Sequence, residues 1–177
     1  MAQIRYGAAA VLASVLLRPD PAGTGQAAHL EGAREVPRWT MPGEPRTVGT
    51  VTQITDGDTI WVSGVDRPVR LLGIEAPEDP CECGGADATA YATEMLQGRK
   101  VTISTDPTQR THDRFGQLLA YAVLPDGTNF SLAAAEAGAV KAYTEKVPVE
   151  VAVEISTAET RARDGGHGMW GPPCYMS

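Results

Sequence analysis

The chain has 177 residues, of which 42% are hydrophobic, and a formal net charge of −7. This length suits one globular domain with an extension, and such a domain can bury an ordinary core without a metal or several disulfides. From Val51 on, 18 acidic residues stand against 10 basic ones, which excludes a nucleic-acid binder that works through overall positive charge. Any polyanion must therefore meet a local cationic spot or a bound metal.

The first 27 residues have the pattern of a targeting segment. A short start with one arginine precedes an apolar stretch of twelve residues, which is too short for a transmembrane helix of about 20 residues. Gly25-Gln26-Ala27 is an acceptable cleavage site. We expect residues 1–27 to be a signal peptide, with an N-terminal anchor or an attached alanine-rich helix as alternatives. After processing we expect no stable membrane span.

Residues 28–46 are expected to be a linker, because they contain three prolines and scattered charges without periodicity. The folded domain is expected at 47–177. It begins with β-rich runs, and Asp56-Gly57 is a hairpin turn signal between the first two of them. These runs predict strands at about 48–55, 59–65 and 67–74.

Helices and strands alternate in the rest of the chain. Apolar residues at helical spacing from Ala88 to Leu96 predict a helix that ends at Gly98, and another set from Val151 to Ala162 predicts the last helix. The remaining expected elements are strands at 101–106 and 118–124, a short helix at 130–137, a brief extended piece at 139–143 and the last helix at about 149–163. Five strands with one helix between the third and fourth predict an α+β, mainly β, fold, a five-stranded OB-type barrel with about three helices.

Three kinds of group used in metal-dependent phosphodiester cleavage stand close together near the start of the domain. Asp58 and Glu75 are hard oxygen ligands for a divalent cation, Arg70 can hold a phosphate, and Glu78 can serve an attacking water. Three adjacent short strands would carry these side chains to one end of a small sheet.

Each of these groups also has a purely structural interpretation. Aspartates such as Asp58 are common turn formers, and Glu78 can be a solvated loop acid. Arg70 can be a surface arginine that pairs with Asp66 or Glu82. For the aspartate alone, the turn interpretation is the stronger one.

Three motifs carry a resemblance to a known family: DGDT at 56–59, VRLLGIEAPE at 69–78 and DRFGQLLAY from Asp113 to Tyr121. In order and spacing they are similar to the motifs of the staphylococcal nuclease family, and the resemblance extends from about Val48 to Cys174. It implies calcium-dependent hydrolysis of DNA or RNA.

The resemblance also implies roles for individual residues. The carboxylates of Asp58 and Glu75 and the backbone carbonyl of Ala76 would bind Ca²⁺. Glu78 would act as the general base or orient the nucleophilic water, and Arg70 would be one of two arginines that clamp the scissile phosphate. Tyr143 stands where the family offers an aromatic ring and a hydroxyl to the substrate, although a tyrosine of the core or rim is an equal alternative.

The chain departs from the family pattern at three positions. Glu75 replaces an aspartate, which is expected to weaken calcium binding. Gln117 replaces the second phosphate-clamping arginine, and loss of one such cation can lower the rate by about 10³–10⁵. Phe115 stands where many members have tyrosine. Arg110 or Arg114 could reach in from the same hairpin, but strand alternation does not place Arg114 on the face of Gln117.

Three cysteines bear on stability and compartment. Secreted members of the family resemble this chain in having a cysteine in the loop after Glu78 and another near the C-terminal Trp-Gly, which implies a bridge to Cys174. Either Cys83 or Cys81 can be its partner. A Cys83–Cys174 bridge would close about 90 residues and contribute roughly 4 kcal/mol. A zinc site is the alternative, but only His167 stands nearby as a further soft ligand.

Two functional hypotheses follow. The first is an exported, secreted, calcium-dependent endonuclease of reduced activity. It would be a monomer that binds DNA or RNA weakly, with the help of its metal. The second is a catalytically inactive barrel that serves as a nucleic-acid-binding, protein-binding or structural module.

Overall fold

A computed structural model describes residues 46–78 and 82–175 of the chain. The expected signal peptide, nearly all of the expected linker and Cys81 lie outside the described residues, so the predicted domain boundaries stay a prediction. Within the described part, none of the helices combines the length and the apolar composition that crossing a membrane requires.

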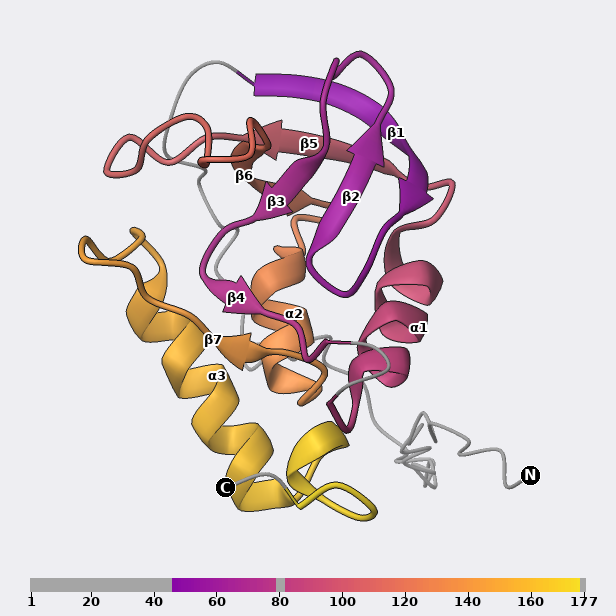
Figure 1. Ribbon diagram of the computed structural model, residues 1–177, viewed down its shortest axis with the longest axis vertical. Helices are drawn as coiled ribbons and strands as arrows, with labels where there is room; N and C mark the ends of the chain where they lie inside the picture. The colour runs from indigo at the N-terminus through magenta and orange to yellow at the C-terminus, as the bar shows by residue number, and fades with distance from the viewer. Residues whose placement is uncertain (1–45, 79–81, 176–177) are drawn as a thin grey trace, which may run out of the picture. The chain divides into compact units, whose positions relative to one another are not determined.

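Five strands close into a barrel whose neighbours follow the order β1-β2-β3-β6-β5 (Figure 1). The pairing of β3 with β6 is parallel and all other neighbouring pairs are antiparallel. This arrangement confirms the predicted mainly β barrel. The strands are β1 (Arg46–Ile54), β2 (Thr59–Val62), β3 (Val69–Leu71), β5 (Lys100–Ser104) and β6 (Leu118–Val123).

The long first strand closes the barrel. Its first half, from Arg46 to Thr50, pairs with β5, and its second half, from Val51 to Ile54, pairs with β2. The register with β2 shifts between Val51 and Gln53, and an irregularity of this kind bends a strand and increases its twist. One strand can therefore belong to both sides of the barrel.

In the described part of the chain, three α-helices accompany the barrel: α1 (Gly85–Leu96), α2 (Phe130–Glu136) and α3 (Ala152–Gly165), followed by a 3₁₀ turn at Gly168–Trp170. The predicted apolar faces are the buried ones, since Ala88, Ala92 and Leu96 of α1 are inaccessible. The same holds for Ile155 and Ala158 of α3. In Figure 1, α2 and α3 lie side by side below the barrel, and α1 lies beside it, against β1.

The predicted strand at 67–74 is wrong in one respect, because the chain breaks it into two. After β3 the backbone turns at Gly73, whose φ of +79° suits glycine, and where a Cβ would stand 2.4 Å from Cδ1 of Ile155. The next strand, β4 (Ile74–Glu75), leaves the barrel and pairs with β7 (Lys141–Ala142), the extended piece expected after α2. The hydrophobic run continues on both sides of Gly73, so no hydrophobic pattern marks this break.

A buried carboxylate fixes the loop that follows β5. Asp106 is 2% exposed, and it accepts hydrogen bonds from Tyr121 Oη (2.6 Å), Thr108 N (2.8 Å), Thr108 Oγ1 (2.7 Å) and Glu150 N (2.8 Å). Burial opposes ionisation of Asp106, but the hydrogen bonds from Thr108, Tyr121 and the Glu150 amide lower its pKa below the usual 3.8. Asp106 thereby joins β6, the loop after β5 and the entry to α3.

We expect Asp106→Asn to lower the free energy of unfolding by about 2–4 kcal/mol at neutral pH, because an amide cannot accept all four bonds. A lowered native pKa means that ionised Asp106 adds stability above about pH 4, and that this stability is lost as the pH falls through the native pKa. In urea unfolding from about pH 7 to pH 3, the difference between wild type and variant should therefore narrow as the pH falls. Glu94→Gln, on the exposed face of α1, is the control, and parallel curves for wild type and Asp106→Asn would contradict the assignment.

Candidate active site

Arg70 lies between two carboxylates at one end of the barrel. Its Nη1 is 2.8 Å from Oδ1 of Asp58, and its Nη2 is 2.5 Å from Oε2 of Glu75. Nη1 also donates to the carbonyl of Ile74 at 3.1 Å. The side chains of Asp58 and Arg70 are 8% and 19% exposed, whereas that of Glu75 is half exposed. The three side chains thus share one site, as the sequence predicted.

Neighbouring strands bring these residues together. Arg70 is paired with Thr59 in the β2–β3 register, and Asp58 directly precedes Thr59. The carbonyl of Asp58 accepts the amide of Leu71 at 2.8 Å, which fixes Asp58 beside β3. Glu75 comes from β4, so the break at Gly73 is what turns its carboxylate back toward Arg70.

The turn before Asp58 packs tightly against the rest of the site. A Cβ at Gly57 would stand 2.8 Å from the Cβ of Ala76 and 2.7 Å from that of Ala88, so only glycine fits between these two segments. Oδ1 of Asp56 accepts the amide of Asp58 at 3.0 Å. Asp56 and Gly57 are thus the turn formers expected from the sequence, and they also hold Asp58 in place.

The carboxyl of Asp58 is nearly enclosed by hydrogen-bond donors. Oδ2 accepts the amide of Ala76 at 2.6 Å, and Oδ1 accepts Thr59 Oγ1 at 3.1 Å. Burial is the strongest influence and raises the pKa of Asp58 from 3.8 to about 7, although Arg70 and the Ala76 amide act in the opposite direction. A further cation beside Asp58 would favour its ionised form. Sequence reasoning expected the carbonyl of Ala76 at this site and missed its amide, because no side-chain pattern reports a backbone donor.

The donor set fits a hard cation. Asp58 and Glu75 already converge on one positive group, and all the side-chain atoms that they offer are oxygens, which Ca²⁺ prefers. Among the described residues no cluster of three or more His, Cys, Asp and Glu side chains could hold a metal ion. Backbone oxygens and waters would therefore have to complete a calcium shell, which takes six to eight ligands.

A cleft of about 660 Å³ opens beside Arg70 and Glu75. Its walls are the segment between β5 and β6 and the segment that follows β7. Its charged lining residues are four basic ones, Arg70, Arg110, Arg114 and Lys146, and three acidic ones, Glu75, Asp113 and Glu145. The cleft is therefore slightly positive within a domain of strongly negative charge.

Several predicted substrate-contacting residues line this cleft, namely Phe115, Gln117, Arg114 and Tyr143. Gln117 directly precedes β6, whose Leu119 is paired with Arg70 of β3. Phe115 is 74% exposed and its ring lies 4.7 Å from the guanidinium of Arg114. Tyr143 is half exposed, and its amide donates to the carbonyl of Gly73 at 2.9 Å.

The alternation argument for Arg114 does not apply, because residues 113–117 form a turn and not a strand. Oδ1 of Asp113 accepts the amides of Phe115 and Gln117, both at 2.8 Å, and this turn brings Arg114 to the same cleft as Gln117. Glu145 and Lys146 also line the cleft. No motif marks these two residues, and only the path of the chain after β7 places them there.

Other predicted residues lie differently. The surface partners considered for Arg70 are wrong, since Asp66 pairs with Arg67 at 3.0 Å and Glu82 lies 3.6 Å from Lys141. Glu78 is exposed and follows β4, and its carbonyl accepts the amide of Glu82 at 2.6 Å. Neither Glu78 nor Asp58 is among the described residues that line the cleft, although Asp58 contacts Arg70, which does line it.

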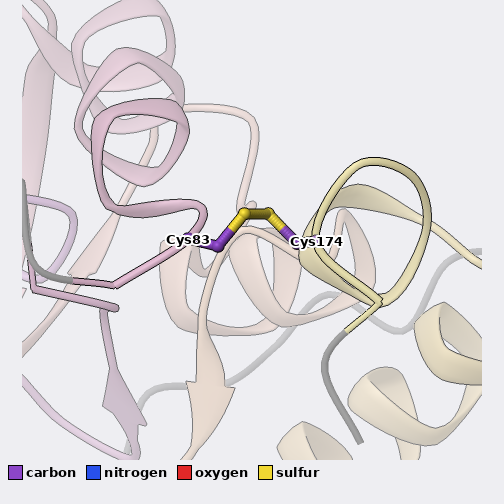
Figure 2. The surroundings of a disulfide bond; sticks show 2 residues. All are labelled: Cys83 and Cys174. Carbon is purple, nitrogen blue, oxygen red and sulfur yellow. A yellow bond between two sulfur atoms is a disulfide. The ribbon is translucent and has the colours of Figure 1, made fainter.

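A disulfide joins Cys83 to Cys174 across 91 positions of sequence, with the Cα atoms 5.6 Å apart (Figure 2). It ties the segment before α1 to the segment after the 3₁₀ turn. This settles the pairing that the sequence left open for Cys83, whereas Cys81 lies outside the described residues. The zinc alternative is wrong for these two cysteines, because sulfurs bonded to each other are not available as thiolate ligands.

Comparisons with known proteins agree with this geometry. The family described as "Staphylococcal nuclease homologue" matches residues 68–172, which include Arg70, Glu75, Glu78 and Gln117. An uncharacterized protein of Bacillus anthracis is 30% identical over 155 residues, which are 80% of this chain and 72% of that protein. A protein of Escherichia coli O157:H7 named "Uncharacterized endonuclease" is 30% identical over 128 residues, or 69% of this chain and 76% of the relative, and one from Escherichia coli is equally similar.

Arg70→Gln is expected to lower the free energy of unfolding by about 2–3 kcal/mol near pH 8, because it leaves the buried Asp58 carboxylate without its cation. Since the native pKa of Asp58 is raised, protonated Asp58 favours folding at low pH, and this contribution is lost as the pH rises through about 7. The penalty of the substitution should therefore shrink below about pH 6, where the carboxyl is protonated in both proteins.

Urea unfolding in EDTA, near pH 8 and below about pH 6, measures this loss of unfolding free energy. Arg161→Gln, which removes an exposed arginine of α3, is the matched control for the change in charge. A loss of equal size at both pH values would show that Arg70 acts through packing and not through the charge of Asp58.

Proposed function

The chain belongs to the staphylococcal nuclease family, and from this we propose that it is an exported, calcium-dependent endonuclease that hydrolyses phosphodiester bonds of DNA and RNA with reduced turnover. A nuclease-like function is the coarser conclusion that the family match supports. The observation that carries the proposal is the guanidinium of Arg70, held between Asp58 and Glu75 at the edge of a slightly positive cleft.

The proposed roles follow from the contacts. A bound Ca²⁺ would supply positive charge that polarises the scissile phosphate and offsets charge in the transition state. Asp58 and Glu75 would hold it through their carboxylate oxygens. Arg70 lines the cleft and would bind phosphate oxygens through its planar donors once a metal shares the two carboxylates.

Glu78 is the proposed base or water-orienting group. It is exposed, so an ionised carboxylate at this position can accept a proton from water and release it to solvent. Its backbone is held by the hydrogen bond between its carbonyl and the amide of Glu82. The side chain of Glu75 is longer than that of aspartate, and its carboxylate is half exposed. Both features fix the carboxylate less firmly, which supports weaker calcium binding.

Reduced turnover rests on Gln117. This side chain lines the cleft at the start of β6, where an arginine would face the substrate, and an amide donates hydrogen bonds without adding charge. One missing cationic contact to a phosphoryl group lowers rates by about 10³–10⁵ in enzymes that depend on it.

Export is proposed from two features. The Cys83–Cys174 disulfide is of a kind that persists in oxidising compartments, and the apolar stretch near the N-terminus has the pattern of a signal peptide. Together they support a secreted protein. We propose that it acts as a monomer.

A second function, an inactive binding module, is favoured by one specific observation. Arg70 already has Asp58, Glu75 and the carbonyl of Ile74 as partners, so three of its five N–H groups are engaged before any phosphate binds. If the metal binds too weakly to draw the carboxylates away, the cleft could retain a nucleic acid or a protein segment without cutting it.

The first functional test is cleavage of plasmid and single-stranded DNA with Ca²⁺ or with EGTA. We expect slow cleavage that EGTA abolishes, and a fall of about 10²–10⁴ in rate for Glu78→Gln, since an amide cannot take a proton from water. Glu136→Gln, on α2, is the matched control and should cut at the wild-type rate. Equal rates for wild type and Glu78→Gln that EGTA abolishes would exclude Glu78 as the base, whereas no cleavage by wild type above the background without protein would support the inactive module.

Gln117→Arg tests the proposed loss of a phosphate clamp. The substitution restores a guanidinium at the start of β6, and we expect kcat to rise by at least tenfold, because the added charge acts mainly on the transition state. Single-turnover cleavage of a labelled oligonucleotide separates this effect from binding. If only KM changes, Gln117 does not limit the chemical step.

A further inference from the structure

Two segments face each other across the mouth of the cleft, and one ion pair joins their side chains. Nη2 of Arg110, from the segment after β5, lies 3.0 Å and 3.2 Å from the two carboxylate oxygens of Glu145, which follows β7. Both residues line the cleft that also contains Arg70 and Gln117. The pair is therefore part of the surface that a bound strand would meet.

The backbone near Arg110 is fixed without help from this ion pair. Gln109 Nε2 donates to the carbonyl of Val147 at 2.9 Å. Asp106 accepts both the amide of Thr108 and the amide of Glu150, at 2.8 Å each. Arg110 thus stands on a loop attached to the opposite wall at two other points.

The ion pair itself is easily exchanged. The side chains of Arg110 and Glu145 are 56% and 42% exposed, and exposed pairs contribute little to stability because water screens them. A carboxylate and a phosphate present similar oxygens to a guanidinium. Glu145 therefore occupies Arg110 with an anion that a phosphate group can replace at small cost.

We propose that Arg110 is a phosphate-binding residue of this cleft, and that Glu145 is the internal anion which the incoming nucleic-acid strand displaces. This inference deepens the proposed nuclease function and rests on it. Arg110 would supply part of the charge that Gln117 lacks, from the same segment between β5 and β6. Displaced Glu145 would turn to solvent, where its charge is screened.

Arg114 is a weaker choice for this role. Its guanidinium lies 4.7 Å from the ring of Phe115, which is exposed, and this cation–π contact holds it at the turn of residues 113–117. Arg110 is instead bonded through Nη2 to a carboxylate of the facing segment, so its guanidinium already holds an anion of the kind that a phosphate would replace.

Binding of a fluorescein-labelled oligothymidylate to the full chain in EDTA, measured by fluorescence anisotropy at about 50–200 mM salt, tests the proposal without catalysis. Arg110→Gln should raise Kd about three- to tenfold and reduce the slope of log Kd against log salt by about 0.7. Glu145→Gln should lower Kd about two- to fivefold, because it frees the guanidinium. This gain should shrink in the Arg110→Gln background.

Arg161→Gln is the matched control, since Arg161 also forms an exposed pair, with Glu136, but lies on α3 away from this cleft. Equal Kd values and salt slopes for Arg110→Gln and Arg161→Gln would overturn the proposal, as would a Glu145→Gln gain of equal size in both backgrounds. Thermal unfolding of each variant confirms that it is folded.

The same variants separate this inference from the proposed function. If the binding shifts appear but Ca²⁺ supports no cleavage by wild type, Arg110 is a nucleic-acid contact in an inactive module and the enzymatic proposal fails. If wild type cuts and Arg110→Gln binds and cuts as well as Arg161→Gln, the enzyme stands and the role of Arg110 is wrong.

Discussion

The contact of one arginine with two carboxylates from different strands is the constraint on which the candidate site depends. Arg70 comes from the middle of β3, Asp58 from the turn before β2 and Glu75 from β4, so the site exists only if all three segments have their observed register. A shift of one residue in β3 would turn Arg70 into the barrel core, where Val69 and Leu71 now lie. The hydrophobic core therefore enforces the geometry of the charged site.

A second buried carboxylate organises the opposite side of the cleft. Asp106 connects β6, the loop after β5 and the entry to α3, and its four hydrogen bonds replace the water that it loses on burial. The pKa values of the two acids are shifted in opposite directions for a physical reason. Asp106 has enough donors to stay ionised when buried, whereas burial outweighs the donors around Asp58 and raises its pKa to about 7. One acid is a fixed structural element, and the other can respond to a cation.

Much of this arrangement was predictable from sequence, and the limits have specific causes. The hairpin at Asp56-Gly57, the apolar faces of α1 and α3 and the neighbourhood of Asp58, Arg70 and Glu75 follow from local patterns of spacing and turn chemistry. The break at Gly73 was not predictable, because a buried hydrophobic run continues through it and the reason for the turn is contact with Ile155 on a distant helix. The pair of Arg110 with Glu145 joins segments 35 positions apart, and no local pattern encodes it.

The bridge between Cys83 and Cys174 has a consequence for the fate of the protein after damage. The two cysteines are 91 positions apart in the sequence, and the chain between them contains α1, β5, β6, α2, β7, α3 and the 3₁₀ turn. A protease that cuts any exposed loop within this span leaves both pieces covalently joined, so they can stay associated through the barrel core and the cross-link. Such a nicked molecule would migrate as two fragments on a gel only after its disulfide is reduced. On a non-reducing gel it would migrate as one species.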